Sequence, residues 1–206
     1  MFEPYAHGFL HRSVAASRGA VVLTHGAGSN SRAPLLVAVA EELAGQGWTV
    51  FRFDLPFRRR RASGPPHPST SAQDREGIHE AAILVRGEFP GELILGGQSY
   101  GGRQTTMLAA EQPQLANGLL LLSYPLHPPG KPTQLRTEHF PSIRAKAAFV
   151  HGARDSFGSP EEMRTALAFI PAVTSLHIIE GAGHDLGRPP AKAATRIGTV
   201  VREVFG

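Results

Sequence analysis

The chain has 206 residues, of which 41% are hydrophobic and 18% are charged, and its formal net charge at pH 7 is +4. This composition is typical of an ordered globular protein, and the length favours one well-buried core, so we expect a single domain over residues 1–206. The chain contains no cysteine, which excludes disulfides, thiolate metal sites and a cysteine nucleophile.

Apolar and basic residues are spread along the chain. No apolar run reaches the roughly 20 residues that a membrane-spanning helix needs, and the first residues lack the apolar segment of a signal peptide. The excess of 21 Lys and Arg over 17 Asp and Glu is small. We therefore expect a cytoplasmic protein that partners neither a membrane nor a nucleic acid. No pair of histidines has the spacing and carboxylate neighbours of a zinc site, so neither a metal nor another cofactor is expected.

Short apolar runs alternate with amphipathic stretches in the first half of the chain. Residues 19–28 form a predicted strand that ends in a glycine-rich loop, and residues 33–47 form a helix closed by glycine. A second strand is predicted at 48–56 and a second helix at 71–89. The intervening segment, 57–70, is rich in proline, glycine and serine and is a predicted loop.

This loop opens with four consecutive arginines, Arg58 to Arg61. A solvated basic loop is the first interpretation of such a run. A site for an anionic substrate or an acidic partner is the alternative.

The alternation continues in the second half of the chain. A strand at 91–99 runs into a helix at 102–112, which Pro113 ends. The apolar strand 116–126 precedes a proline-rich loop at 127–141. The remaining elements are predicted strands at 145–155 and 174–186 and predicted helices at 159–170 and 190–205. Near-continuous apolar strands are typical of a sheet buried on both faces, so we predict an α/β fold: a three-layer α/β/α sandwich with a mostly parallel sheet.

One serine, Ser99, lies at the sharp corner between the strand at 91–99 and the helix that follows. Gly97 precedes it by two positions and Gly101 follows it by two. Glycines at these positions allow the close strand-to-helix turn that exposes a nucleophilic serine above the sheet. A tight turn with no chemistry is the alternative, and the spacing alone does not decide between them.

A serine nucleophile needs a base and a carboxylate that orients the base. Asp155 and His184 follow two later predicted strands, and the order Ser99, Asp155, His184 is the one expected when all three side chains come from carboxyl ends of successive strands. Two other carboxylates, Asp185 and Asp54, are alternatives for the acid. Asp185 adjoins His184 but points elsewhere, and Asp54 has a structural role in this interpretation.

Acyl transfer also needs backbone N–H groups that stabilise the oxyanion of the tetrahedral intermediate. One donor is predicted at Tyr100, directly after the serine. The second is predicted in the loop after the first strong strand, at Ala27, with Gly28 next to it.

Together these segments resemble the α/β-hydrolase superfamily. The motifs HGAGSNS, FDLPFRRRR, GGQSYGGR, SYPLHPPGKPTQLRTEH, VHGARDSFG and GAGHDL resemble its small capless branch related to dienelactone hydrolase, which includes the testis-expressed and NSL-complex-subunit type hydrolase-like proteins. The resemblance implies a catalytic triad of Ser99, Asp155 and His184 and an oxyanion loop at His25 to Gly28. It does not imply a settled substrate.

The chain has no insertion long enough for a substantial cap, so we expect an open site walled by the loops at 57–70 and 127–141. Such a site favours small or polymer-borne esters. The expected substrate-binding residues are His25, Gly28, Tyr124 and His127, with Arg136 as a further pocket-lining candidate.

The leading functional hypothesis is a serine hydrolase, in particular a carboxylesterase acting through an acyl-enzyme. A second hypothesis is a non-catalytic module that uses the hydrolase fold and the arginine run to hold an acidic partner. A third, nucleic-acid binding, predicts an affinity that falls steeply with salt.

Overall fold

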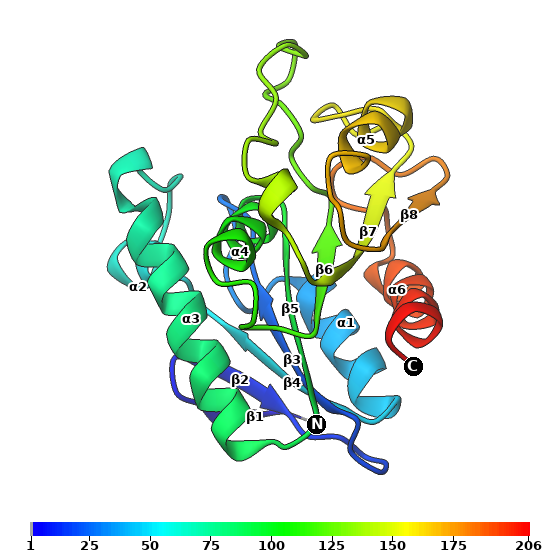
Figure 1. Ribbon diagram of the computed structural model, residues 1–206. Helices are drawn as coiled ribbons and strands as arrows, with labels where there is room; N and C mark the ends of the chain where they lie inside the picture. Colours follow the sequence, from blue (N-terminus) through cyan, green and yellow to red (C-terminus); the bar gives the residue numbers. More distant parts are fainter. Residues whose placement is uncertain (1) are drawn as a thin grey trace.

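Eight strands form one sheet in the computed structural model, which describes residues 2–206 (Figure 1). The strand order is β1-β2-β4-β3-β5-β6-β7-β8. The first two strands run antiparallel to their neighbours, and all other pairs are parallel. The strands are β1 (Glu3–Tyr5), β2 (Gly8–His11), β3 (Gly19–Thr24), β4 (Trp48–Phe53), β5 (Glu92–Gln98), β6 (Gly118–Leu122), β7 (Lys146–Gly152) and β8 (Thr174–Ile179).

Helices cover both faces of the sheet, as Figure 1 shows. On one face lie α1 (Pro34–Gly45) and α6 (Pro190–Phe205), which pack against each other and against the sheet. On the other face lie α3 (Ser71–Glu88), α4 (Tyr100–Glu111) and α5 (Pro160–Leu167), with the short α2 (Pro56–Arg60) beside α3. The predicted three-layer α/β/α sandwich with a mostly parallel sheet is confirmed.

The core consists of two apolar layers, one on each face of the sheet. Successive residues of a strand point to opposite faces, so in β3 Val21 and Leu23 join the layer under α1 and α6, whereas Ala20 and Val22 join the layer under α3 and α4. All six residues of β3 are buried. This burial on both faces explains why the central strands are uninterrupted apolar runs.

The predicted strands are present as β3 to β8, but each ends before its predicted carboxyl end. The residues beyond the strands form the loops above the sheet that carry the polar motifs. Four further elements were not predicted: the antiparallel strands β1 and β2, the helix α2 in the segment predicted as a loop, and the 3-10 turn at Pro68–Thr70. Another 3-10 turn, Phe140–Ser142, lies in the proline-rich segment after β6. Within residues 2–206, no helix combines the length and the apolar character needed to cross a bilayer.

A buried histidine in β2 makes the stability of the fold dependent on pH. His11 is 1% exposed, and its Nε2 accepts a hydrogen bond of 2.8 Å from Arg52 Nε. Burial, together with the nearby charge of Arg52, lowers the pKa of His11 from 6.5 to about 4. The unfolded chain binds this proton near pH 6.5, so the contribution of neutral His11 to stability is complete above pH 6.5 and is lost as the pH falls toward 4.

We expect the free energy of unfolding, measured by denaturant titration at a series of pH values, to fall between pH 6.5 and 4. The fall should be smaller in His11→Gln, because glutamine supplies an acceptor for Arg52 and does not titrate. His7→Gln, at an exposed position in the same region, is the control and should keep the wild-type slope. Equal slopes for wild type and His11→Gln would contradict this account.

Candidate active site

Ser99 lies at a strained corner between β5 and α4. It is the N-cap of α4, with φ 51° and ψ −115°, a backbone conformation that residues with a side chain rarely adopt. The flanking glycines make the corner possible. A Cβ on Gly97 would collide with Thr24 Oγ1 and the backbone of Gly101, and a Cβ on Gly101 would collide with Thr24 and the carbonyl oxygen of His25. The surrounding structure therefore holds the serine in its strained conformation.

The structure brings Ser99, His184 and Asp155 into direct contact, although 85 residues separate the first two in the sequence. His184 Nε2 lies 2.8 Å from Ser99 Oγ. His184 Nδ1 lies 2.8 Å and 3.0 Å from the two carboxylate oxygens of Asp155. Since a carboxylate only accepts hydrogen bonds, Nδ1 carries the proton and Nε2 is free to accept the hydroxyl proton of Ser99.

The loops after β7 and β8 fix the carboxylate and the imidazole. The Asp155 side chain is fully buried, whereas that of His184 is 27% exposed. Asp155 Oδ1 also accepts a 2.9 Å hydrogen bond from the backbone N–H of Phe157. The Phe157 ring stacks on the His184 imidazole, with 4.2 Å between the ring centroids. Sequence reasoning missed Phe157, because an aromatic residue in a loop carries no pattern that distinguishes this position.

The loop after β3 lies against the nucleophile corner. A Cβ built on Gly26 would be 3.6 Å from Ser99 Cβ, so the backbone of this loop approaches the serine closely. In the part of the chain that the structure describes, the backbone N–H groups of Ala27 and Tyr100 donate to no protein acceptor. A bound group could therefore take up both donors.

His25 is a structural residue, and its prediction as a substrate-binding residue is wrong. Its side chain is fully buried. Nε2 accepts a 3.1 Å hydrogen bond from the N–H of Leu55, so Nδ1 carries the proton and donates to the carbonyl of Gly26 at 2.9 Å. Burial lowers the pKa of His25, and the neutral ring joins the loop after β3 to the segment after β4.

Arg58 corrects the interpretation of residues 57–70 as a solvated basic loop. It lies in α2 and is only 6% exposed. Its guanidinium donates to the carbonyls of Ser29 at 2.7 Å and Ala27 at 2.8 Å, and also to those of Gly64 and Arg61. Arg58 therefore holds the loop that contains Ala27, and it is not free to bind an acidic partner. The other three arginines of the run are exposed.

Tyr124 and His127 do not line an open pocket, so these two substrate-binding predictions are also wrong. Tyr124 is 1% exposed, its ring packs against Phe140 and Phe149, and its hydroxyl donates to the carbonyl of Arg136 at 2.6 Å. His127 is 5% exposed and donates through Nδ1 to the carbonyl of Pro128 at 2.8 Å. Both residues anchor the 127–141 segment to the core.

The alternative carboxylates are engaged elsewhere. Asp54 accepts a 2.6 Å hydrogen bond from the N–H of Ser31, which supports its interpretation as a structural residue. Asp185 accepts from the N–H of Gly187 at 3.0 Å. Gly28 is exposed, and a Cβ there would meet no atom within 4 Å, so Gly28 stays a predicted substrate-binding residue. Among residues 2–206, no three His, Asp or Glu side chains gather as a metal site would require.

Comparison with known proteins places the chain in a family. A family model described as an alpha/beta hydrolase domain matches residues 17–204. The fold is similar to that of Est1E from Butyrivibrio proteoclasticus, determined with bound ferulic acid, with a TM-score of 0.79, 16% identity, and coverage of 95% of this chain and 94% of that one.

Two further structures have the same fold. The dienelactone hydrolase from Anabaena variabilis has a TM-score of 0.72 and 22% identity, and the match covers 96% of this chain and 89% of that one. XC6422 from Xanthomonas campestris, described as a serine hydrolase without a lid, has a TM-score of 0.69 and 16% identity, with coverage of 98% and 93%. The chain therefore belongs to the α/β-hydrolase superfamily.

Proposed function

We propose that this protein is a serine hydrolase that cleaves carboxylic esters through an acyl-enzyme, with Ser99 as the nucleophile, His184 as the general base and acid, and Asp155 as the group that orients His184. The observation that carries the proposal is the His184 imidazole, which lies within 3.0 Å of both the Ser99 hydroxyl and the Asp155 carboxylate. These contacts match the geometry that nucleophilic catalysis by serine requires.

The reaction proceeds in two halves. His184 Nε2 removes the Ser99 proton as Oγ attacks the ester carbonyl, and the resulting imidazolium then protonates the departing alcohol. In the second half, a water gives a proton to the same nitrogen and attacks the acyl group, which releases the acid and regenerates Ser99. The buried Asp155 carboxylate stabilises the imidazolium in both halves.

The oxyanion of each tetrahedral intermediate is assigned to the N–H groups of Tyr100 and Ala27. A donor of this kind lowers the barrier by about 3 to 4 kcal/mol. Because the hydrogen bonds of His25 and Arg58 fix the loop that carries Ala27, this donor is preorganised before substrate arrives.

A small or polymer-borne ester is the proposed substrate, and Gly28 is proposed to line its binding site. The His184 side chain is partly exposed, which agrees with a site open to solvent. Two proteins of the same fold support this class: Est1E was determined with ferulic acid bound, and the Anabaena variabilis protein is a dienelactone hydrolase.

A fluorophosphonate probe tests the proposal directly, since it reacts covalently with activated serine hydroxyls. We expect one adduct per chain, located by peptide mass spectrometry on Ser99, and loss of 4-nitrophenyl acetate turnover in step with labelling. A protein that remains unlabelled, or that still turns over the ester when fully labelled on Ser99, would contradict the proposal.

Arg58 gives a second test, through the oxyanion loop. Arg58→Met should lower kcat for the same ester about 10²-fold, the effect of losing one oxyanion donor, because the carbonyls of Ala27 and Ser29 lose their donor. Arg60→Met, in the same helix but exposed, is the matched control and should keep the wild-type kcat. Circular dichroism checks that both variants fold. An unchanged kcat in folded Arg58→Met would refute its part in positioning the loop.

A further inference from the structure

A hollow lies between β8 and α6 and is lined by residues of both elements and of the loop that joins them. Its volume is about 460 Å³, within the range of small-molecule sites. Figure 1 shows β8 at the edge of the sheet with α6 beside it. One wall is the loop after β8, which includes Gly181, Ala182, Leu186 and Gly187. The proposed reaction uses none of these residues.

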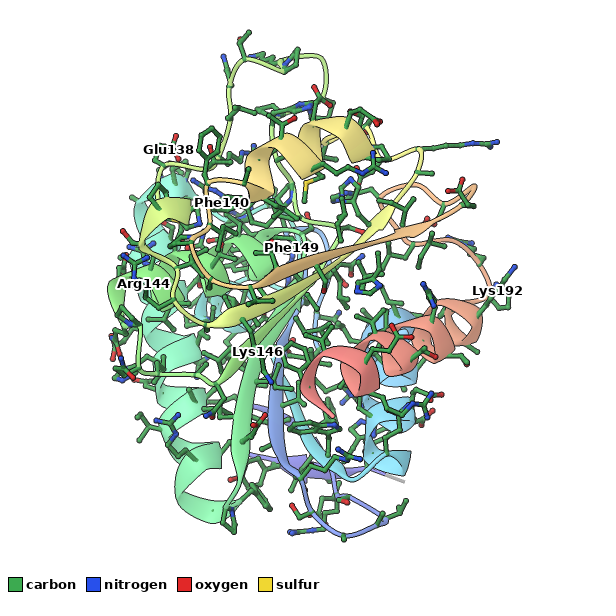
Figure 2. All side chains as sticks on the ribbon, turned by 45° about the vertical axis from the view of Figure 1, so that its right-hand side comes forward. Glu138, Phe140, Arg144, Lys146, Phe149 and Lys192 are labelled. Carbon is green, nitrogen blue, oxygen red and sulfur yellow. The ribbon has the colours of Figure 1, made fainter. Side chains whose placement is uncertain are left out.

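Three cations line this hollow. Lys192 and Arg196 are four residues apart in α6, which places them on one side of the helix, and Arg188 lies just before the helix begins. Figure 2 shows Lys192 at the N-terminal end of α6. Within residues 2–206, Lys192 and Arg196 form no salt bridge, and Arg188 has only a 3.9 Å approach to the exposed Asp185. One carboxylate, that of Glu180, lines the same space.

The floor of the hollow is apolar. The apolar residues that line it come from β8, from the loop after β8 and from α6, and include Ile179, Ala182, Leu186 and Ala193. Arg196 borders this floor from the α6 side. A ligand that fits both features needs an anionic group for the cations and an apolar part for the floor.

We propose that this hollow is a binding site for a small organic phosphate monoester, with its phosphate among Arg188, Lys192 and Arg196 and its apolar group on the floor. Lys192 and Arg196 form no salt bridge among residues 2–206, and two such cations match the charge of a phosphate dianion better than that of a monoanion, although Glu180 also lines the hollow and Asp185 lies 3.9 Å from Arg188. The apolar floor distinguishes such an ester from inorganic phosphate, because burial of the alkyl group adds to the affinity. The site does not depend on the proposed hydrolase function.

Isothermal titration calorimetry tests this proposal with hexyl phosphate, inorganic phosphate and hexanol as probes. Hexyl phosphate should bind at least about tenfold more tightly than either of the others. The double variant Lys192→Gln/Arg196→Gln should weaken hexyl phosphate about tenfold or more. Arg202→Gln, at an exposed position of the same helix outside the hollow, is the matched control and should bind as the wild type does.

Each other outcome overturns the proposal. Equal affinity for hexyl phosphate and inorganic phosphate would show that the apolar floor does not contribute to binding and that the hollow is only a basic surface. Binding of hexyl phosphate that is unaffected by the double variant would place the site elsewhere, and absence of binding to folded wild-type protein would exclude it. Circular dichroism establishes that the double variant is folded, and the single variants Lys192→Gln and Arg196→Gln provide the same comparison if it is not.

Discussion

Replacing Ser99 by alanine is expected to lower kcat for 4-nitrophenyl acetate by about 10⁴- to 10⁶-fold, the range found when serine hydrolases lose their nucleophile. Without Oγ no acyl-enzyme forms, and only the oxyanion donors and binding contribute to turnover. The fold should be unaffected. Alanine keeps the Cβ of serine, so the conformation at φ 51° costs no more than before, and within residues 2–206 the hydroxyl that is removed forms a side-chain hydrogen bond only with His184. Steady-state kinetics and thermal unfolding of the variant check both expectations.

The neighbouring strand supplies a matched control. Ser123 directly follows β6, is fully buried and also has a positive φ, of 50°. No hydrogen-bond partner is present for its Oγ within residues 2–206, so it makes no hydrogen bond to His184. Ser123→Ala should therefore keep the wild-type kcat. If both alanine variants, or neither, lost turnover, Ser99 would not be the nucleophile.

The sequence predicts the central strands because these strands carry their own signal. Val21, Val22 and Leu23 are buried whichever face they point to, and such a run needs no knowledge of its neighbours to be identified. β1 and β2 are different. They have three and four residues, and they become strands only through pairing, in which Leu10 and His11 lie opposite Phe51 and Val50. That information lies some 40 residues away in the chain.

In the candidate site, too, the sequence predicts the features that have a local cause and does not predict those that depend on packing. The glycines around Ser99 record a local steric requirement, so the strained corner can be predicted from the sequence. Whether a polar residue beyond a strand faces solvent or the core depends on packing. His25 and Tyr124 follow strands just as Asp155 does, but the structure uses them to tie loops to the core. Arg58 is identical in type to the three arginines after it and differs only in its burial.

Asp155→Asn is expected to lower kcat about 10⁴-fold while the fold is kept, because the amide forces the wrong tautomer on His184. The reason lies in the second contact of this carboxylate. Oδ1 accepts from the N–H of Phe157 at 2.9 Å, so the amide oxygen of asparagine must occupy that position. The amide NH₂ then replaces Oδ2, which faces His184 Nδ1 at 2.8 Å.

An N–H donor at that place makes Nδ1 an acceptor and moves the ring proton to Nε2. Nε2 then faces Ser99 as a donor and can no longer act as the base. Asp185→Asn is the matched control: its amide oxygen can still accept from Gly187, and kcat should stay within about twofold of wild type, as for an exposed residue outside the reaction. If kcat of Asp155→Asn remained within about tenfold of wild type, His184 would not depend on this carboxylate. The loss of turnover must therefore follow the position of one proton on the imidazole, because Asp155→Asn changes that position and leaves the hydroxyl of Ser99 in place.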